Sequence, residues 1–376
     1  MNELKELISI FIKIYNKGPQ WTILRFRKEF RQPSFRPVLD AIVAFKIANR
    51  RLKAIFFKEK KGATDYVTAV YDTSVNPMSY DFAFFLAAVE LFALNNKKST
   101  FIVLFVPRID DCIIDRKSQH VVDGESLNWR FENIILPLMN IYPACIGHSI
   151  LPKRSDISEA IKGKLLYPEL YSESFPMADY YWDVFTSKNK FSGFSASVQG
   201  KRYIESWKKN NKITGEIVTI TLRKYQWDPI RNSKVDEWVK FAQFIKEKGF
   251  TPVFIPDTEA CFEHDSRLDD FIVFEAPCWN LGIRMALYQD VCLNLFTCSG
   301  TSAIAILNRN ATSICMNQMA QNSMISTIKV FEKMGVRVGQ KTYGFFEDHF
   351  QILSWEDDTF ENIREEFNRF LAAIPL

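Results

Sequence analysis

The segment VCLNLFTCSGTSAIAILN (residues 291–308) joins a strand pattern to a helix pattern through a short polar loop. Residues 291–298 are mostly apolar and of strand length, and residues 303–308 have a helical composition. The loop between them consists of Ser299, Gly300, Thr301 and Ser302. A strand–loop–helix crossing of this kind is the repeating unit of a parallel α/β sheet. Its loop is either a simple capping turn or part of a ligand site.

The same alternation runs through the second half of the chain. The pattern predicts strands at residues 216–223, 250–257, 271–277, 291–298 and 311–316. A helix is predicted at 233–249, with Ser233 as its N-cap and Gly249 as its stop. A second, strongly periodic helix is predicted near the end of the chain, at 354–374. Strands that alternate with helices indicate a parallel sheet.

The first half shows the pattern less regularly. It predicts strands at 66–72, 100–108 and 144–150 and helices at 82–96 and 127–142, after which the periodicity fades from about 152 to 208. The sequence therefore predicts an α/β protein with two Rossmann-like lobes and a C-terminal helix. The predicted parts are a basic amphipathic N-terminal arm (1–61), a first lobe (62–170), a linker (171–210) and a second lobe (211–376).

The composition is that of a globular protein and argues against several classes. Apolar residues make up 47% of the chain and charged residues 24%. No run approaches the roughly 18–20 uninterrupted apolar residues that span a bilayer, and the start has no signal-peptide pattern. The seven cysteines form no CxxC pair, which favours reduced thiols in a cytoplasmic protein over a zinc site or a disulfide framework.

Charge is distributed unevenly along the chain. The arm contains 15 Lys and Arg against 5 Asp and Glu, whereas the remaining 315 residues contain 33 against 39. Within the arm, aromatic residues alternate with basic ones, as in WTILRFRKEFRQPSFRP (residues 21–37). Such a segment either packs on the body by its aromatic side or contacts the inner face of a membrane. Nucleic acid is not the expected partner, because the rest of the chain is acidic.

Polar residues follow the predicted strands of the second half, at the edge where parallel α/β sheets bind ligands. They are Arg223 and Lys224, then Asp257 and Glu259, then Glu275, and finally Ser299–Ser302, while Asn232 and Arg231 lie in the loop after the first of these strands. Basic side chains and the N–H groups of a helix start suit a diphosphate. Gly300 would allow a close approach of the ligand and an unusual φ.

Each of these signals has a structural alternative. The loop 299–302 also has the composition of an N-capping turn. Arg223 ends an apolar strand and is costly to bury alone, so it either forms an ion pair with Glu259 or Glu275 or contacts an anionic ligand. Because Arg223 and the loop are predicted at the same edge, both should contact the same ligand.

The first half offers candidates for a general base. Asp81 lies at a helix start and His148 closes the stretch ACIGH, while Asp72 ends a predicted strand. The alternatives are a helix-capping role for Asp81 and an edge position with a backbone partner for His148. The chain contains no GxSxG, Walker, GxGxxG or HExxH motif, so hydrolase, NTPase, NAD-enzyme and zincin functions lack support. No metal site is predicted.

Residues 215–376 resemble the donor-binding lobe of GT-B glycosyltransferases, especially the heptosyltransferase-like and fucosyltransferase-like branches. The resemblance is carried by VTITLR (218–223), by FTCSGTSAIAILN (296–308) and by the terminal helix; residues 65–150 share only the architecture. The loop CSGTS departs from the glycine-proline or threonine-glycine forms, followed by histidine, of a heptosyltransferase. There is no clear DxD motif, which is consistent with GT-B and with a metal-independent enzyme.

This resemblance implies a cytoplasmic glycosyltransferase without a cofactor, acting in surface polysaccharide synthesis. It would take a nucleotide-sugar on the second lobe and a glycan or lipid-linked acceptor on the first, with membrane contact through the arm. Arg223, Lys224 and the loop would hold the diphosphate, the three acidic residues would lie near ribose or sugar hydroxyls, and Asp81 or His148 would be the base. Two alternatives remain: another nucleotide-sugar enzyme of this fold, such as an epimerase or a pyruvyl transferase, and a non-catalytic scaffold at a membrane surface.

Overall fold

The computed structural model describes most of the chain, in two compact units. The described residues are Phe45, 64–108, 124–173, 176, 178–226, 228–320, 323, 326–346 and 350–373. The predicted arm, apart from Phe45, lies outside them. One unit comprises the described parts of 1–76, 103–113 and 149–178, and the other those of 77–102, 114–148 and 179–376. The lobe boundaries predicted from the sequence stay predictions.

The first sheet has four strands in the order β3-β2-β1-β4. They are β1 (Val67–Asp72), β2 (Phe101–Val106), β3 (Cys145–Ile150) and β4 (Leu166–Tyr167), and β4 runs parallel to β1. β1 is buried along its whole length. Its Val70 packs with Leu104, Ile157 and Tyr171 in a small apolar core.

Helical segments lie between these strands in the chain, and the last two, α7 and α8, precede the second sheet. They are α3 (Asp81–Asn95), α4 (Gly124–Arg130), η1 (Phe131–Ile135), α5 (Leu136–Asn140), η2 (Arg154–Asp156), α6 (Ile157–Ala160), α7 (Tyr180–Phe185) and α8 (Val198–Asn210). The single helix predicted at 127–142 is therefore divided by the π-helical turn η1. Pro137 lies in the first turn of α5 and has no N–H to donate to the preceding turn, which accounts for the break.

The second sheet has six strands, all parallel to their neighbours, in the order β10-β9-β8-β5-β6-β7. They are β5 (Ile217–Thr221), β6 (Thr251–Ile255), β7 (Ile272–Val273), β8 (Leu293–Thr297), β9 (Ser313–Met316) and β10 (Gln351–Leu353). The chain builds outward from β5 to one edge, then returns to β8 and builds to the other. This is the doubly wound order, and it confirms the predicted α/β class with Rossmann-like topology.

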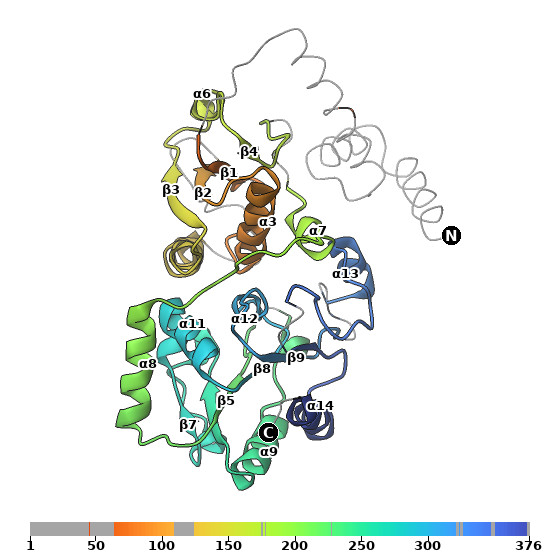
Figure 1. The fold of residues 1–376 in the computed structure, drawn as a ribbon. Helices are drawn as coiled ribbons and strands as arrows, with labels where there is room; N and C mark the ends of the chain where they lie inside the picture. The colour runs from red at the N-terminus through yellow and green to blue at the C-terminus, as the bar shows by residue number, and fades with distance from the viewer. Residues whose placement is uncertain are drawn as a thin grey trace, which may run out of the picture. The chain divides into compact units, whose positions relative to one another are not determined.

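Helices cover both faces of this sheet, as Figure 1 shows. The elements that follow β5 are η3 (Pro229–Arg231), α9 (Val235–Glu247), η4 (Thr258–Ala260), η5 (Ser266–Leu268), α10 (Ala276–Trp279), α11 (Leu281–Asp290), α12 (Ser302–Ile306), α13 (Ile328–Met334) and α14 (Phe360–Ala373). On one face, Phe241 of α9 packs edge-on against Phe367 of α14, with ring centroids 5.4 Å apart. On the other, Thr221 of β5 hydrogen-bonds Tyr288 of α11 at 3.0 Å. The side chains of successive β5 residues thus point to opposite faces of the sheet.

Several predictions differ from the structure. The helix predicted at 233–249 is α9, whose N-cap residue is Lys234, so the prediction of Ser233 as its N-cap is wrong; the Ser233 hydroxyl instead accepts the N–H of Arg223. The helix predicted at 354–374 is α14, which begins only at Phe360. The strand predicted at 271–277 is only β7, because Pro277 opens the short helix α10 within the same stretch. The sequence did not predict β10, whose three residues extend the sheet beyond β9.

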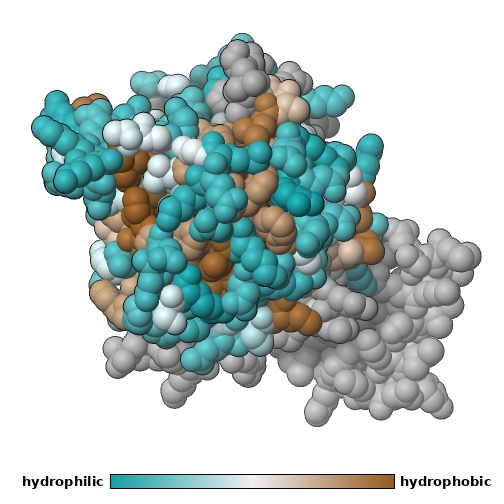
Figure 2. Space-filling view, turned by 90° about the horizontal axis from the view of Figure 1, so that it is seen from below, coloured by the Kyte–Doolittle hydropathy of each residue, from teal (hydrophilic) through white to brown (hydrophobic). Residues whose placement is uncertain are grey.

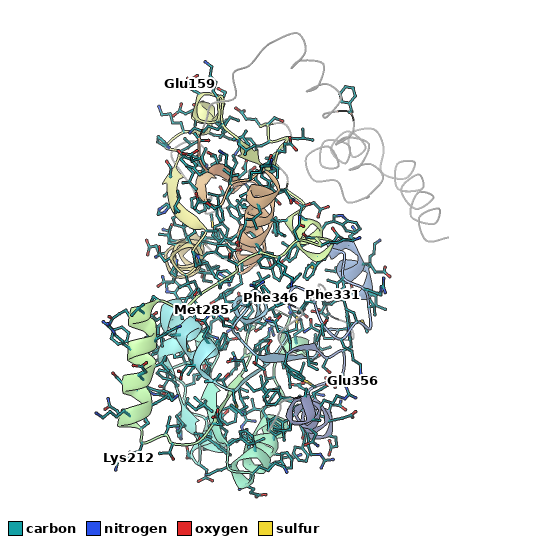
Figure 3. All side chains as sticks on the ribbon, in the orientation of Figure 1. Glu159, Lys212, Met285, Phe331, Phe346 and Glu356 are labelled. Atoms are coloured by element: carbon teal, nitrogen blue, oxygen red, sulfur yellow. The ribbon has the colours of Figure 1, made fainter. Side chains whose placement is uncertain are left out.

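Aromatic side chains fill the region beside α7 and the segment that follows it. Phe185 lies 5.3 Å from Phe345 between ring centroids, and Phe191 lies 5.2 Å from Phe346, which Figure 3 labels. The chain contains 33 phenylalanines, and here their rings pack together segments that are more than 150 residues apart in the sequence. In contrast, the face seen in Figure 2 is mainly hydrophilic, with small separate apolar spots.

A buried carboxylate fixes the segment that leads from α7 to α8. Glu90 of α3 is 2% exposed and accepts hydrogen bonds from the Tyr142 hydroxyl (2.6 Å) and from the backbone N–H groups of Ser192 (2.7 Å) and Gly193 (3.3 Å). The next residue, Phe194, donates its N–H to the carbonyl of Leu307 at the end of α12. This segment therefore supports the helix that follows the 299–302 loop.

Replacing Gly193 by alanine should destabilise this support strongly. Gly193 has φ +73°, and an added Cβ would lie 2.1 Å from the Leu307 carbonyl oxygen. We expect Gly193→Ala to lower the free energy of unfolding by more than about 3 kcal/mol, measured by denaturant titration. Gly339→Ala is the matched control, because Gly339 has φ +83° but nothing within 4 Å. It should cost only about 1 kcal/mol, and equal losses for the two variants would contradict this account.

Candidate functional site

The reversal of strand order places two loops next to each other at the carboxyl edge of the second sheet. β5 and β8 are neighbours, paired from Val218 with Leu293 to Thr221 with Phe296. One loop follows β5 and begins with Leu222 and Arg223, and the other follows β8 and begins with Cys298. In doubly wound sheets this switch point is where a crevice forms and ligands bind.

Arg223 is held in a fixed position after β5. The residue is 6% exposed, and its Nη1 donates to the Asp228 carbonyl (3.2 Å) and to the side-chain oxygen of Asn232. Its backbone N–H donates to the Ser233 hydroxyl at 2.8 Å. Burial, and then the neighbouring cation Arg231, lowers the pKa of Arg223. The surroundings of this guanidinium therefore disfavour its charge, as expected of a site that an anion would complete.

Arg231 connects the two loops. From η3, its Nη2 donates to the carbonyl oxygen of Cys298 at 2.8 Å and lies 3.7 Å from the Cys298 sulfur. Its Nε is buried and has no hydrogen-bond partner among the described residues. An unmet buried donor costs about 1–3 kcal/mol. Two guanidinium groups therefore lie next to each other here, and one of them has an unmet donor.

The loop after β8 is closed largely by its own hydrogen bonds. The Ser302 hydroxyl donates to the Ser299 carbonyl at 2.6 Å, and the hydroxyls of Ser299 and Thr301 lie 3.1 Å apart. The backbone N–H groups of Ser302 and Ala303 donate to the Ser299 and Gly300 carbonyls. α12 has only five residues, so the helix-dipole contribution expected from the sequence is small. The hydroxyls of Ser299 and Thr301 are the groups of this loop best suited to a ligand.

Gly300 serves a purpose other than the one expected from the sequence. Gly300 is not among the glycines with positive φ, so the prediction that it has an unusual φ is wrong. The close approach is real, but it is made by the Tyr80 ring, whose Cδ2 would lie 2.7 Å from an added Cβ. Tyr80 precedes α3, and burial raises the pKa of its hydroxyl to about 12, with Arg284 opposing the effect.

Arg284 is a third buried cation near this edge. The residue is 1% exposed, its Nε donates to the Pro277 carbonyl (2.6 Å), and its Nη1 donates to the Tyr288 hydroxyl (3.0 Å). Through Tyr288 it reaches Thr221, the last residue of β5. The sequence interpretation missed Arg284 and Tyr80. An arginine inside the apolar helix pattern WNLGIRMALYQ was the signal that could have indicated Arg284.

The predicted acidic and basic residues occupy different parts of the edge. Asp257 accepts the N–H of Lys224 at 3.1 Å, and burial raises the pKa of its carboxyl. Glu259 is exposed, and burial followed by the nearby Asp257 raises its pKa. Glu275 is exposed at the start of α10. The side chain of Lys224 is largely exposed and pairs with Glu263.

The base candidates differ in how close they lie to the loop after β8. Asp81 adjoins Tyr80, which contacts Gly300, and its carboxylate accepts hydrogen bonds from Tyr181 and from the Ser79 hydroxyl (3.0 Å). His148 lies exposed on the edge strand β3. The structure therefore relates Asp81, and not His148, to the loop after β8 through a described contact.

Asp72 is engaged within the other unit. It is fully buried, and it binds the Arg154 guanidinium through both oxygens, at 2.9 and 2.6 Å. The Tyr171 hydroxyl donates to the same carboxylate at 2.9 Å. A carboxylate with these partners stabilises the end of β1, and its two oxygens are taken up by Arg154 and Tyr171.

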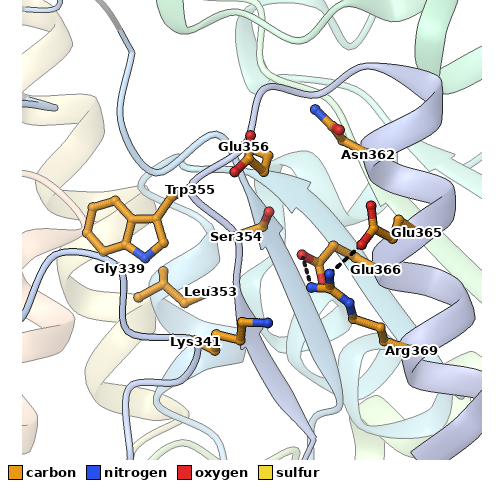
Figure 4. Close-up of a pocket in the computed structure, with 10 residues that line it drawn as sticks. All are labelled: Gly339, Lys341, Leu353, Ser354, Trp355, Glu356, Asn362, Glu365, Glu366 and Arg369. Atoms are coloured by element: carbon orange, nitrogen blue, oxygen red, sulfur yellow. Dashed lines mark hydrogen bonds and ion pairs between the residues drawn. The ribbon is translucent and has the colours of Figure 1, made fainter.

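A cavity of about 470 Å³ lies elsewhere, between the β10 region and α14 (Figure 4). Its lining residues are Gly339, Lys341, Leu353, Ser354, Trp355, Glu356, Asn362, Glu365, Glu366 and Arg369. Arg369 is paired with Glu366 (3.0 Å) and Glu365. None of the residues predicted to bind substrate lines this cavity. Those residues lie instead at the carboxyl edge of the second sheet, near the loops after β5 and β8.

Comparison with known proteins gives remote structural similarity only. No family model and no curated protein sequence matches the chain. A glycosyl transferase of family 9 from Veillonella parvula DSM 2008 has 10% identity and a TM-score of 0.43, over 84% of this chain and 91% of that one. The E. coli ADP-heptose LPS heptosyltransferase II has 10% identity and a TM-score of 0.47, over 82% and 98%. An E. coli heptosyltransferase, WaaC with ADP, has 10% identity and a TM-score of 0.39, over 82% and 100%.

These structures belong to the class that the sequence resembles. Similarity at this level does not establish a reaction, so the function of this chain is inferred from its own residues.

The contact between Tyr80 and Gly300 can be tested by a double-mutant cycle. Gly300→Ala should lower the free energy of unfolding by about 1–2 kcal/mol, because the tyrosine ring must move away from the added methyl group. In a Tyr80→Ala background the same change should cost little. Gly147→Ala, with nothing within 4 Å of the added Cβ, is the neutral control. A loss at Gly300 that persists without Tyr80 would show that the contact is not the cause.

Proposed function

We propose that this chain is a glycosyltransferase that uses a nucleoside-diphosphate sugar. The observation that carries the proposal is the pair of guanidinium groups, Arg223 and Arg231, at the switch point of the doubly wound sheet. The buried Nε–H of Arg231 has no partner among the described residues, and a phosphate oxygen would supply one. A neutral ligand would supply no negative charge to these two adjacent guanidinium groups.

The charge of the diphosphate explains why this arrangement suits group transfer. When the bond from the sugar to the diphosphate breaks, negative charge develops on the leaving phosphate oxygen. Fixed cations close to that oxygen stabilise the transition state more than the ground state. In this proposal Arg223 and Arg231 provide that stabilisation, while the hydroxyls of Ser299 and Thr301 donate to the phosphate oxygens.

The remaining residues of the edge would bind the neutral parts of the donor. Asp257, Glu259 and Glu275 offer acceptors for ribose or sugar hydroxyls, at the ends of β6 and β7. Asn232 holds Arg223 and the backbone of Tyr225, so it orders the loop over the ligand. Lys224 lies at the exposed rim with Glu263.

Transfer also needs a group that removes the proton from the acceptor hydroxyl. Asp81 is the better of the two predicted bases, because it adjoins Tyr80 beside the loop after β8. His148 is the second choice. The acceptor would be a glycan or a lipid-linked glycan of a surface polysaccharide.

Two further predictions belong to this proposal. Within the described ranges no three His, Cys, Asp or Glu side chains form a group that could hold a metal ion, and metal independence stays a prediction. The described helices include none that is long and apolar enough to cross a membrane. Contact with the inner face of a membrane through residues 1–61, in a cytoplasmic protein, is likewise proposed.

A thermal-shift panel of UDP, GDP, ADP, CMP and dTDP tests the site directly. At least one nucleotide should raise the melting temperature, since a ligand at 100 times its Kd adds about 2.7 kcal/mol. Arg223→Met and Arg231→Met should remove that shift and lower transfer by roughly 100-fold or more, while the ligand-free protein stays folded. Arg364→Met, an exposed change on α14, is the matched control. No shift with any nucleotide, or activity of Arg223→Met within a few-fold of the original, would contradict the proposal.

A further inference from the structure

Three described cysteines have intermediate exposure, and one of them lies in the proposed donor site. They are Cys145 on β3, Cys292 before β8 and Cys298 after β8. The Cys145 thiol faces the Gly147 carbonyl (3.7 Å), and the Cys292 thiol faces the Ile217 carbonyl (3.0 Å). Cys298 alone among the three faces cations. Its sulfur lies 3.7 Å from Nη2 of Arg231, whose Nη2 also binds the carbonyl of the same residue.

A second thiol supports Cys298 from the neighbouring strand. β8 and β9 pair in parallel, with Phe296 opposite Cys315 and Thr297 opposite Met316, and the N–H of Cys298 continues the ladder to the Met316 carbonyl at 2.9 Å. Cys298 is two residues beyond Phe296, so its side chain points to the same face as Cys315. The Cys315 thiol is almost fully buried and accepts a hydrogen bond from Nε2 of Gln318.

These contacts shift the pKa values of the three cysteine thiols in different directions. The neighbouring Cys315 thiol, with Arg231 and Arg223, lowers the pKa of Cys298 to about 6 despite burial. Burial raises the pKa of Cys145 to about 11 and that of Cys292 to about 12. The titratable groups that face the two paired thiols are Arg231, Arg223 and Tyr343. The guanidinium of Arg231 beside its sulfur thus favours the thiolate of Cys298, whereas burial favours the protonated thiols of Cys145 and Cys292.

We propose that Cys298 is a modification site for low-molecular-weight disulfides, at the edge where the donor diphosphate binds. The Cys298 thiolate attacks one sulfur of the reagent RSSR, the protein–S–SR bond forms, and RS⁻ leaves. The protein thiol is oxidised and half of the reagent is reduced, so no other oxidant is needed. A thiol reverses the step.

The modification would act as a switch on the proposed donor site, and this consequence rests on the proposed function. The added group lies beside Arg231 and removes the negative charge that this guanidinium faces. It also occupies space at the loop before Ser299. A bound diphosphate and the thiolate would compete for Arg231, so the nucleotide should protect Cys298, and the modified protein should not bind the nucleotide.

The test uses the full chain with 4,4′-dithiodipyridine at pH 7 and mass spectrometry of each cysteine-containing peptide. Cys298 should react roughly 100-fold faster than Cys145 and Cys292, the ratio expected from thiolate fraction offset by lower nucleophilicity. Arg231→Met should slow the reaction at Cys298 by about tenfold or more and leave Cys145 unchanged. Cys292→Ser is the matched control and should keep the fast reaction, which Cys298→Ser abolishes.

The outcomes separate this inference from the proposed function. If Cys298 reacts no faster than Cys145 and Cys292, or if Arg231→Met leaves its rate unchanged, the modification site is wrong whatever the nucleotide panel shows. If Cys298 reacts rapidly but a nucleotide that stabilises the protein gives no protection, the shared contact with Arg231 is wrong. Fast reaction with no binding of any nucleotide supports the thiol site and contradicts the donor site.

Discussion

The hydrogen bond from Arg231 to the carbonyl of Cys298 is the interaction on which the proposed site depends. It joins the loop after β5 to the loop after β8, across the point where the order of strands reverses. Without the reversal these loops would not be neighbours, because about 65 residues separate them in the sequence. The bond also brings the guanidinium of Arg231 beside that of Arg223, and this places two cations where an open α/β sheet binds its ligands.

Burial shifts the pKa values of the charged residues at the carboxyl edge of the second sheet. A charge removed from water is costly unless a partner compensates it, and here burial lowers the pKa of Arg223 while it raises that of Asp257. The edge thus holds buried cations and a buried acid close together. In the proposed complex a diphosphate would pair with the cations, and sugar hydroxyls would donate hydrogen bonds to the carboxylates. The thiol of Cys298 lies beside the same cation, Arg231, so under the two proposals its reactivity would depend on the occupancy of the donor site.

Much of the architecture could be predicted from the sequence, because long apolar strands and periodic helices follow local rules. The strands at 216–223 and 291–298, and the position of Arg223 after the first of them, are examples. The break at Pro137, the early end of β7 and the existence of β10 depend on backbone hydrogen bonding and pairing partners that no local pattern specifies. The contact of Tyr80 with Gly300 joins segments about 220 residues apart, so only the folded chain shows it. Arg284 has local partners, Pro277 and Tyr288, and its place in an apolar helix pattern was a signal that the sequence interpretation missed. The substrate-binding and catalytic roles of the predicted residues stay predictions.

The central claim is that Arg223 and Arg231 bind one anion together with the loop after β8. A crystal structure of the protein with the nucleoside diphosphate that stabilises it most would test this directly. The account predicts phosphate oxygens within about 3.2 Å of both guanidinium groups, one of them accepting from Nε of Arg231, and contacts to the hydroxyl of Ser299 or Thr301. A nucleotide bound in the cavity between β10 and α14, or one that contacts neither arginine, would contradict it.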